Sequence, residues 1–317
     1  MSAPAPVALR VTAPVRGALW MVGAAAAFSL MGWSVRALAP IPASEIVLLR
    51  SLFGLVLVVP CLGVPLGSLL RLRWPRLYLL RAGLSYLAML AWFYALHKVA
   101  LADAVALQFT LPLFTILFAV VVFDERVGLR RWSATLAGFT GALVIIRPGF
   151  AEVSLPMVLV LVSAALYAAS NMVIKKLAQT EPSQLVVFYL HALTLPLALL
   201  GALPYWIWPG WGDLPWIAML AVSGSLAHYC FTQSIRAADA SIVMPFDYLR
   251  LPMMAAIGYL AYGEAPVVWT WVGAAVICGA TLYIVRHEAR LARAGPVTAD
   301  AAAAASLEEG HAKARDP

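Results

Sequence analysis

The sequence has very little charge for its length. Of its 317 residues only 12% are Asp, Glu, Lys or Arg, whereas 63% are hydrophobic, and the mean hydropathy is +0.88. A water-soluble domain carries roughly 25% charged residues, so this chain has too few charges to cover a surface in water. We therefore expect an all-α polytopic membrane protein, because a helix satisfies its own backbone hydrogen bonds inside lipid.

Several catalytic and cofactor patterns are also missing. The three cysteines, Cys61, Cys230 and Cys278, lie in apolar segments and have neither disulfide nor metal-ligand spacing. The sequence contains no G-x-x-x-x-G-K-[ST] loop, no H-E-x-x-H and no G-x-S-x-G elbow. We expect no metal, no cofactor and no ATP-driven pump in this chain. A membrane-embedded enzyme or a scaffold stays an open alternative.

What the sequence does have is a series of ten apolar segments, most of them long enough to cross a bilayer as helices. A short Ala/Pro-rich N-terminus, 1–15, and a charged Ala-rich tail, 287–317, are expected to be disordered. The segments are 17–38, 44–63, 77–97, 104–123, 132–147, 155–175, 184–203, 216–234, 241–262 and 267–286.

The positive charge of +7 is distributed as membrane topology requires. Placing the N-terminus in the cytoplasm leaves only Arg36, Lys98 and Arg147 in loops on the other side. The cytoplasmic loops and ends then hold Arg10, Arg16, Arg71, Arg73, Arg76, Arg81, Arg126, Arg130, Arg131, Lys175, Lys176, Arg236, Arg286, Arg290 and Arg293. Since basic residues favour the cytoplasmic side, we expect both termini there, and no nucleic-acid partner.

Two stretches suggest an old duplication. Residues 106–125 (ALQFTLPLFTILFAVVVFDE) and 245–264 (PFDYLRLPMMAAIGYLAYGE) share a plan at an offset of 139. The equivalent pairs are Gln108 and Asp247, Phe109 and Tyr248, Phe123 and Tyr262, Glu125 and Glu264, and Trp132 and Trp271. A unit of five spans is odd, so its second copy enters the membrane from the opposite side. Such inverted repeats are typical of alternating-access transporters.

The two halves resemble EamA-type repeats of the drug/metabolite transporter superfamily. The resemblance lies in ALHKVALADAVALQFTLPLF…DERVGLRRWSATLAGFTGALVIIRPG (95–149) and SIRAADASIVMPFDYLRLP…YGEAPVVWTWVGAAVICGATLYIV (234–285), and it includes EIVLLR (45–50). It implies ten helices in two inverted five-helix repeats, 16–149 and 154–286, around a central cavity built by spans one, three, four, six, eight and nine. Spans five and ten are implied to pack at the edge, where a homodimer interface stays open.

The function expected from this resemblance is secondary transport across the cell inner (plasma) membrane. The partners are a small-molecule substrate, polar or amphipathic, and membrane lipid. Export of an amino acid or metabolite is the main expectation. Import of a vitamin or nucleoside-like cofactor is the alternative.

Ionisable residues inside spans are costly and are the first candidates for binding. Arg50, in span two, suits an anion or carboxylate through its bidentate fork, or clamps Glu45 or helix carbonyls instead. Asp247 and Arg250, three residues apart, either form a self-satisfied intrahelical pair or line the cavity.

Two prolines sit beside these polar positions. Pro112 and Pro252 each remove the hydrogen bond to the carbonyl four residues earlier, which is Gln108 in one repeat and Tyr248 in the other. In lipid a freed carbonyl needs protein, water or ligand. We therefore add Gln108 to the candidate substrate contacts.

The remaining candidates are Tyr94 in span three, Tyr167 and Asn171 in span six, and His228 in span eight. Tyr167 and Asn171 belong to a polar stripe with Ser163 and Ser170 at helical spacing; these serines equally suit helix–helix contacts. His228 is preferred to His191 because the resemblance implies that span eight faces the cavity.

Small residues and span-end carboxylates complete the expectations. Gly138 with Gly141, and Gly273 with Gly279, are expected to allow close helix packing. Glu125 and Glu264 are expected in gate or loop structure, and no partner for Glu264 is visible in sequence.

Overall fold

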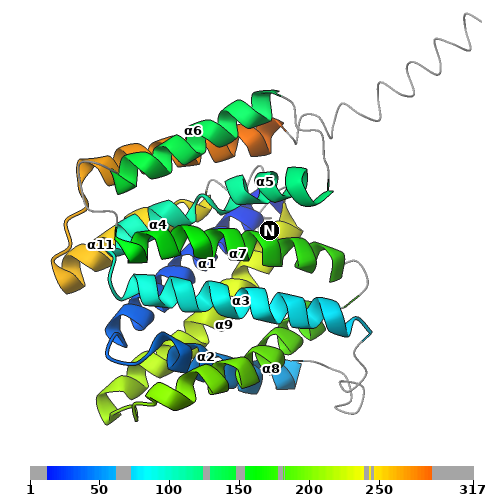
Figure 1. Ribbon diagram of the computed structural model, residues 1–317, viewed down its shortest axis with the longest axis vertical. Coiled ribbons are helices and arrows are strands. Elements are labelled where there is room, and N and C mark those ends of the chain that lie inside the picture. Colours follow the sequence, from blue (N-terminus) through cyan, green and yellow to red (C-terminus); the bar gives the residue numbers. More distant parts are fainter. Residues whose placement is uncertain are drawn as a thin grey trace, which may run out of the picture.

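The computed structural model describes residues 13–61, 73–123, 129–147, 154–177, 181, 183–238, 243 and 246–287. Within these ranges the regular elements are all helical, as the composition predicts (Figure 1). The helices are α1 (Ala13–Ala37), α2 (Ala43–Val58), α3 (Pro75–Leu96), α4 (Leu101–Gln108), α5 (Leu111–Phe123), α6 (Leu129–Ile146), α7 (Leu155–Leu177), α8 (Ser183–Ala202), α9 (Leu214–Ala237), α11 (Arg250–Tyr262) and a last helix that includes Val268–His287.

Seven of the described helical segments are long and apolar enough to cross a membrane. They are Val15–Ala37, Pro75–Leu96, Leu101–Phe118, Leu155–Val173, Leu185–Tyr205, Trp211–Ser234 and Val268–His287. The protein is therefore a multi-pass membrane protein. The helices α2 and α11, with 16 and 13 residues, and the apolar stretch Trp132–Ile146 in α6 are shorter. Ten crossings remain a prediction, while the all-helical fold is confirmed.

Both prolines of the duplicated stretches follow a break in the helix. The span of the first duplicated stretch, residues 106–125, is divided into two helices. Helix α4 ends at Gln108, and α5 begins at Leu111, just before Pro112. In the second half, Tyr248 and Leu249 form a turn directly before α11, and Pro252 lies in its first turn. The two-residue turns 109–110 and 248–249 thus interrupt the helix at equivalent places in the two halves. The Tyr248 carbonyl, which Pro252 was expected to free, instead accepts a hydrogen bond from the Leu251 N–H at 3.0 Å.

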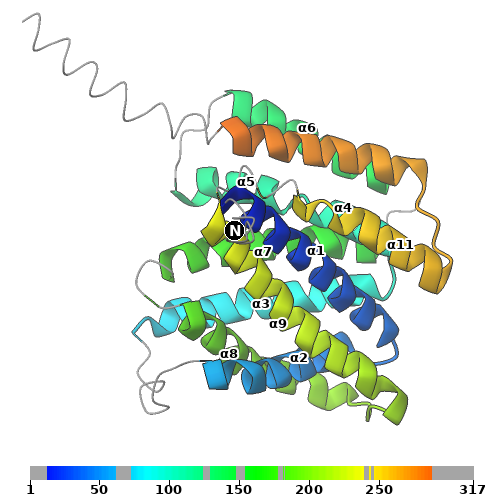
Figure 2. The same cartoon turned by 180° about the vertical axis from the view of Figure 1, so that it is seen from behind.

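The main helix contacts are the same when each helix is replaced by its equivalent in the other half of the chain. Helix α1 packs on α9, and α3 packs on α7, which is the same contact with the halves exchanged. The pairs α2–α9 and α3–α8 are related in the same way, and α2–α8 and α4–α11 each map onto themselves. The two views show α1 beside α9 on one side of the bundle and α3 beside α7 on the other (Figures 1 and 2).

The last helix and α6 form a separate pair at one edge of the molecule (Figures 1 and 2). A Cβ atom added to Gly273 would lie 2.5 Å from the Gly141 carbonyl oxygen, and one added to Gly141 would lie 2.8 Å from that of Gly273. Two helix backbones therefore touch where neither has a side chain. This confirms the expected packing role of Gly141 and Gly273, whereas Gly279 has no atom within 4 Å of its added Cβ.

Side-chain hydrogen bonds also connect helices across the bundle. The hydroxyls of Ser85 on α3 and Ser170 on α7 are 2.8 Å apart, and Ser234 on α9 donates to the Gly17 carbonyl of α1 at 2.7 Å. Ser170 therefore joins helices, which is one of the two roles expected for the serines of its stripe.

Candidate functional site

The centre of the candidate site is the guanidinium of Arg250, which lies near two phenylalanine rings. Its Cζ atom is 5.4 Å from the ring centroid of Phe28 and 5.2 Å from that of Phe109. Phe28 belongs to α1, Phe109 directly follows α4, and Arg250 begins α11, so three spans from both halves meet here. The interaction of a cation with ring faces is favourable where water is excluded.

Two further aromatic groups extend this contact in both directions. The Tyr248 ring meets Phe109 edge to face, with centroids 4.9 Å apart, and the His228 ring meets Phe28 in the same manner at 5.4 Å. The result is a row of flat groups in the order His228, Phe28, Arg250, Phe109 and Tyr248. We call these five residues the aromatic row.

Asp247 lies beside the row as the partner of Arg250. The two side chains form an ion pair of 3.6 Å, and both are only 17% exposed. Asp247 Oδ1 and Arg250 Nε are both buried and have no hydrogen-bond partner. Asp247 and Arg250 thus form the ion pair that was one of the two expectations. The pair leaves one acceptor of Asp247 and one donor of Arg250 unused beside the aromatic row.

Gln108 and the Arg50 region border the same row. Gln108 is buried at the end of α4, next to Phe109, and its Oε1 atom has no hydrogen-bond partner. Arg50 is buried on α2, and its charge lies within electrostatic range of the Tyr167 and His228 side chains. Six of the predicted residues are therefore part of the row or near it: Arg50, Gln108, Tyr167, His228, Asp247 and Arg250.

Two predicted residues outside the row, Tyr94 and Asn171, are exposed, as is His228 within it. Tyr94 is 42% exposed and falls seven residues after Leu87 and fourteen after Leu80, which are both 52% exposed. Because residues seven apart share a helix face, Tyr94 belongs to an apolar outward stripe, and we leave it out of the site proposed below. Asn171 is exposed one turn beyond Tyr167 on α7.

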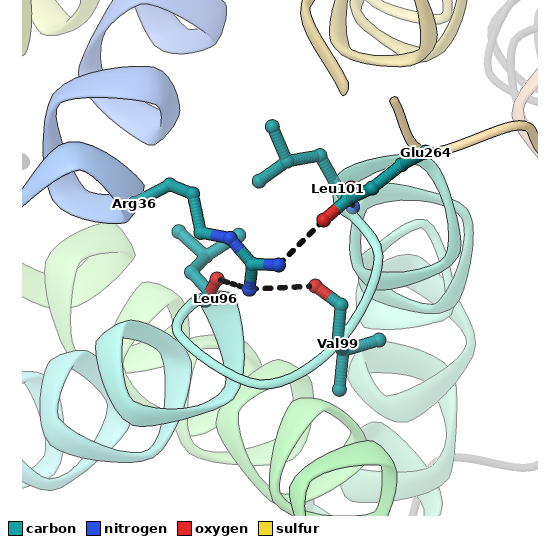
Figure 3. Close-up of polar contacts among 5 residues, drawn as sticks. All are labelled: Arg36, Leu96, Val99, Leu101 and Glu264. Atoms are coloured by element: carbon teal, nitrogen blue, oxygen red, sulfur yellow. Dashed lines mark hydrogen bonds and ion pairs between the residues drawn. The ribbon is translucent and has the colours of Figure 1, made fainter. Parts of the chain in front are cut away.

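A second polar cluster lies at the end of α1, around Arg36 (Figure 3). Its guanidinium donates to the Leu96 carbonyl at 2.7 Å and pairs with Glu264 Oε1 at 2.5 Å. The other oxygen of Glu264 accepts a hydrogen bond from the Leu101 backbone N–H at 2.9 Å. Arg36 and Glu264 thus tie together α1, the α3–α4 turn and the loop after α11.

This cluster supplies the partner of Glu264 that the sequence could not name. Arg36 is separated from it by 228 positions, and no local pattern links the two. A usable signal was present, because Arg36 is one of the three basic residues that the predicted topology places in loops on the outer side. Glu125, the equivalent of Glu264 in the first repeat, lies outside the described residues.

Sequence reasoning also missed the apolar members of the aromatic row, Phe28 among them. Phe109 and Tyr248 were recognised as equivalent positions of the two repeats but not as binding residues. Within the described residues, no group of three or more His, Cys, Asp or Glu side chains is placed to hold a metal ion. The site therefore offers flat apolar faces, two guanidinium groups, a carboxylate and an amide.

Comparison with known protein families decides what kind of protein has this site. The profile of the EamA-like transporter family matches the chain twice, at residues 15–147 and 154–286. The chain belongs to the EamA-like transporter family. It consists of two EamA repeats and is a membrane transporter of the drug/metabolite transporter superfamily rather than an enzyme.

Curated relatives cover most of the chain. A riboflavin transporter of Rhizobium johnstonii is 35% identical over 90% of this chain and 96% of its own length. An S-adenosylmethionine uptake transporter of Rickettsia prowazekii is 29% identical over 77% of this chain and 83% of its own. A pseudopaline exporter of Pseudomonas aeruginosa is 29% identical over 85% of this chain and 96% of its own length.

A solved structure supports the fold. A crystal structure of a protein aligns with a TM-score of 0.59 and 20% sequence identity, and it covers 87% of this chain and 98% of the other. At this identity the likeness shows the fold alone.

Proposed function

We propose that this EamA-like transporter imports a flat heteroaromatic solute, of the vitamin or nucleoside type, and that the aromatic row binds its ring system. The observation that carries the proposal is the position of the Arg250 guanidinium near the rings of Phe28 and Phe109. A guanidinium is planar and stacks on aromatic faces. A flat heterocycle has the same shape and the same preference for such faces.

The relatives support this solute class. Riboflavin and S-adenosylmethionine, which two of them are named for, each contain a fused heteroaromatic ring. We favour import over export, because S-adenosylmethionine transporters of several Rickettsia species among the relatives are named for uptake. The main sequence expectation, export of an amino acid or metabolite, is the second candidate, supported by the pseudopaline exporter.

The proposed mechanism is alternating access between two inverted five-span repeats, 16–149 and 154–286, in the inner membrane, with ten crossings and both termini cytoplasmic. In this topology the Arg36–Glu264 pair closes the outer end of the pathway. We place His228 on the solute pathway inside the bundle, further in than the Arg36–Glu264 pair. The His228 side chain is exposed. It lies one helical turn after Gly224, on the face of α9 that is directed at buried Arg50.

The test is the thermal stability of the purified protein with flat and non-flat solutes. A ligand that binds the folded state raises its apparent stability by mass action. We expect stabilisation by riboflavin or by a nucleoside, and none by amino acids or aliphatic organic acids. Stabilisation by aliphatic compounds alone would contradict the proposed solute class.

A further inference from the structure

Arg50 is a buried cation whose protein partners are poor. Its side chain is 5% exposed, its Nη1 atom lies 3.1 Å from the thioether sulfur of Met89, and its Nε atom has no hydrogen-bond partner. A thioether is a weak acceptor. Within the described part of the chain no carboxylate lies within ion-pair distance of this guanidinium.

The sequence suggested that Arg50 clamps Glu45, and this partner is wrong. Glu45 accepts a hydrogen bond from the Ile207 backbone N–H at 3.1 Å, beyond the end of α8, and its other oxygen has no hydrogen-bond partner. The separation of five residues places Glu45 and Arg50 on different faces of α2. The charge of Arg50 is therefore not neutralised by the acid that precedes it.

The surroundings of Arg50 are shaped to admit it without compensating its charge. A Cβ atom added to Gly224 of α9 would lie 3.2 Å from Arg50 Nε, so the missing side chain leaves room there for the guanidinium. One turn after Arg50, an added Cβ at Gly54 would lie 2.6 Å from the His191 ring. His191, His228 and Tyr167 are all within electrostatic range of Arg50.

Burying an ion without a partner costs several kcal/mol, so a position of this kind is maintained where a ligand supplies the missing charge. We propose that Arg50 binds an anionic oxygen group, a carboxylate or a phosphate, carried by the transported solute. The inference rests on the proposed function insofar as the same solute places its ring on the aromatic row. The row reaches the Arg50 region through His228, which meets Phe28 and interacts with Arg50.

The first test needs no ligand. Replacing Arg50 by Met removes the uncompensated charge and keeps an apolar side chain of similar length, so the empty protein should unfold at a temperature about 2 °C or more higher. Arg81 is the matched control, since it is equally buried but donates from Nη1 to the Val186 carbonyl at 2.5 Å. Arg81→Met should lower the unfolding temperature. A comparable loss in Arg50→Met would show a structural clamp and overturn the proposal.

The second test compares two pairs of probes, each with one neutral and one anionic member. Riboflavin 5′-phosphate carries a phosphate that riboflavin lacks, and nicotinate has a carboxylate where nicotinamide has a carboxamide. The wild type should bind one of the two anions about tenfold more tightly than its neutral counterpart, and Arg50→Gln should abolish this difference. Whichever pair shows the difference identifies the anionic group.

The outcomes separate this inference from the proposed function. If anionic and neutral flat probes bind equally well, the proposed function is supported and the proposed role of Arg50 is wrong. If no flat probe binds but Arg50→Met stabilises the empty protein, the heteroaromatic solute is wrong and the uncompensated cation remains. If Arg50→Met destabilises and charge makes no difference, Arg50 is structural.

Discussion

The rings of Phe109 and Tyr248 meet edge to face with centroids 4.9 Å apart, although 139 residues separate them. These two positions correspond in the two repeats, so each repeat contributes the same residue position to one contact. A contact between equivalent positions lies on the axis that relates the halves. The aromatic row is therefore built where a motion of one half against the other changes distances least, which suits a site that stays intact during alternating access.

The rings of the row should be needed for transport. Phe28→Ala and Phe109→Ala each remove one face near Arg250, and we expect either change to lower solute affinity about tenfold or more, because stacking on a ring is worth about 1–3 kcal/mol. The measurement is a binding titration on purified protein. Phe139→Ala is the control, since its ring packs on Phe114 between α5 and α6, away from the row. Equal losses in all three variants would indicate general destabilisation.

The Arg36–Glu264 pair should be coupled in stability. Both side chains are 18% exposed, and removal of either one leaves a partly buried charge without its partner, so Arg36→Ala and Glu264→Ala should each destabilise the fold by about 1–3 kcal/mol. The double variant should lose less free energy of unfolding than the two single variants lose together. Thermal unfolding of the four proteins gives this coupling, and additive effects would show that the ion pair contributes nothing.

The contact between α6 and the last helix gives a prediction with an internal control. An added methyl at Gly273 meets the Gly141 carbonyl oxygen, whereas one at Gly279 meets nothing within 4 Å. Gly273→Ala should therefore destabilise by about 1–3 kcal/mol through overpacking, while Gly279→Ala should be neutral or stabilise by up to about 1 kcal/mol through helix propensity. Circular dichroism during heating compares them. The reverse order would contradict the packing.

The number of crossings is tested by reporter fusions after Lys98 and Asp213. With an N-terminus in the cytoplasm and ten spans, both positions face outside, because three and seven spans precede them. A periplasmic alkaline phosphatase should be active at both sites, and a fluorescent protein that folds only in the cytoplasm should stay dark. A cytoplasmic result at either position would break the inverted-repeat topology.

Much of the fold could be predicted because membrane helices leave a strong local signal. Apolar length gave the positions of the spans, and Pro112 and Pro252 gave the interruptions before α5 and α11. The offset between the repeats gave the equivalence of Phe109 and Tyr248, although not their contact. These features depend on hydropathy and backbone chemistry, which neighbouring residues determine.

The candidate site could be predicted where it carries charged or polar side chains, but not where it is built of aromatic rings. Arg50, Asp247 and Arg250 stood out because ions are rare inside spans, whereas Phe28 looked like any lipid-facing or packing ring. The partner of Glu264 could not be found, because Arg36 comes close to it only through the packing of α1 against α11. The exposure of Tyr94 could not be predicted either, because which side of α3 is covered depends on the helices that pack against it.

Uptake into proteoliposomes tests the central claim most directly. Purified protein would be reconstituted, and entry of radiolabelled riboflavin and of a labelled nucleoside measured against empty liposomes and against liposomes with the Phe28→Ala/Phe109→Ala variant. The account predicts saturable entry of at least one of these flat solutes, competed by other flat heteroaromatic compounds and lost in the variant. Entry of amino acids with no flux of flat solutes, or flux unchanged by loss of both rings, would contradict it.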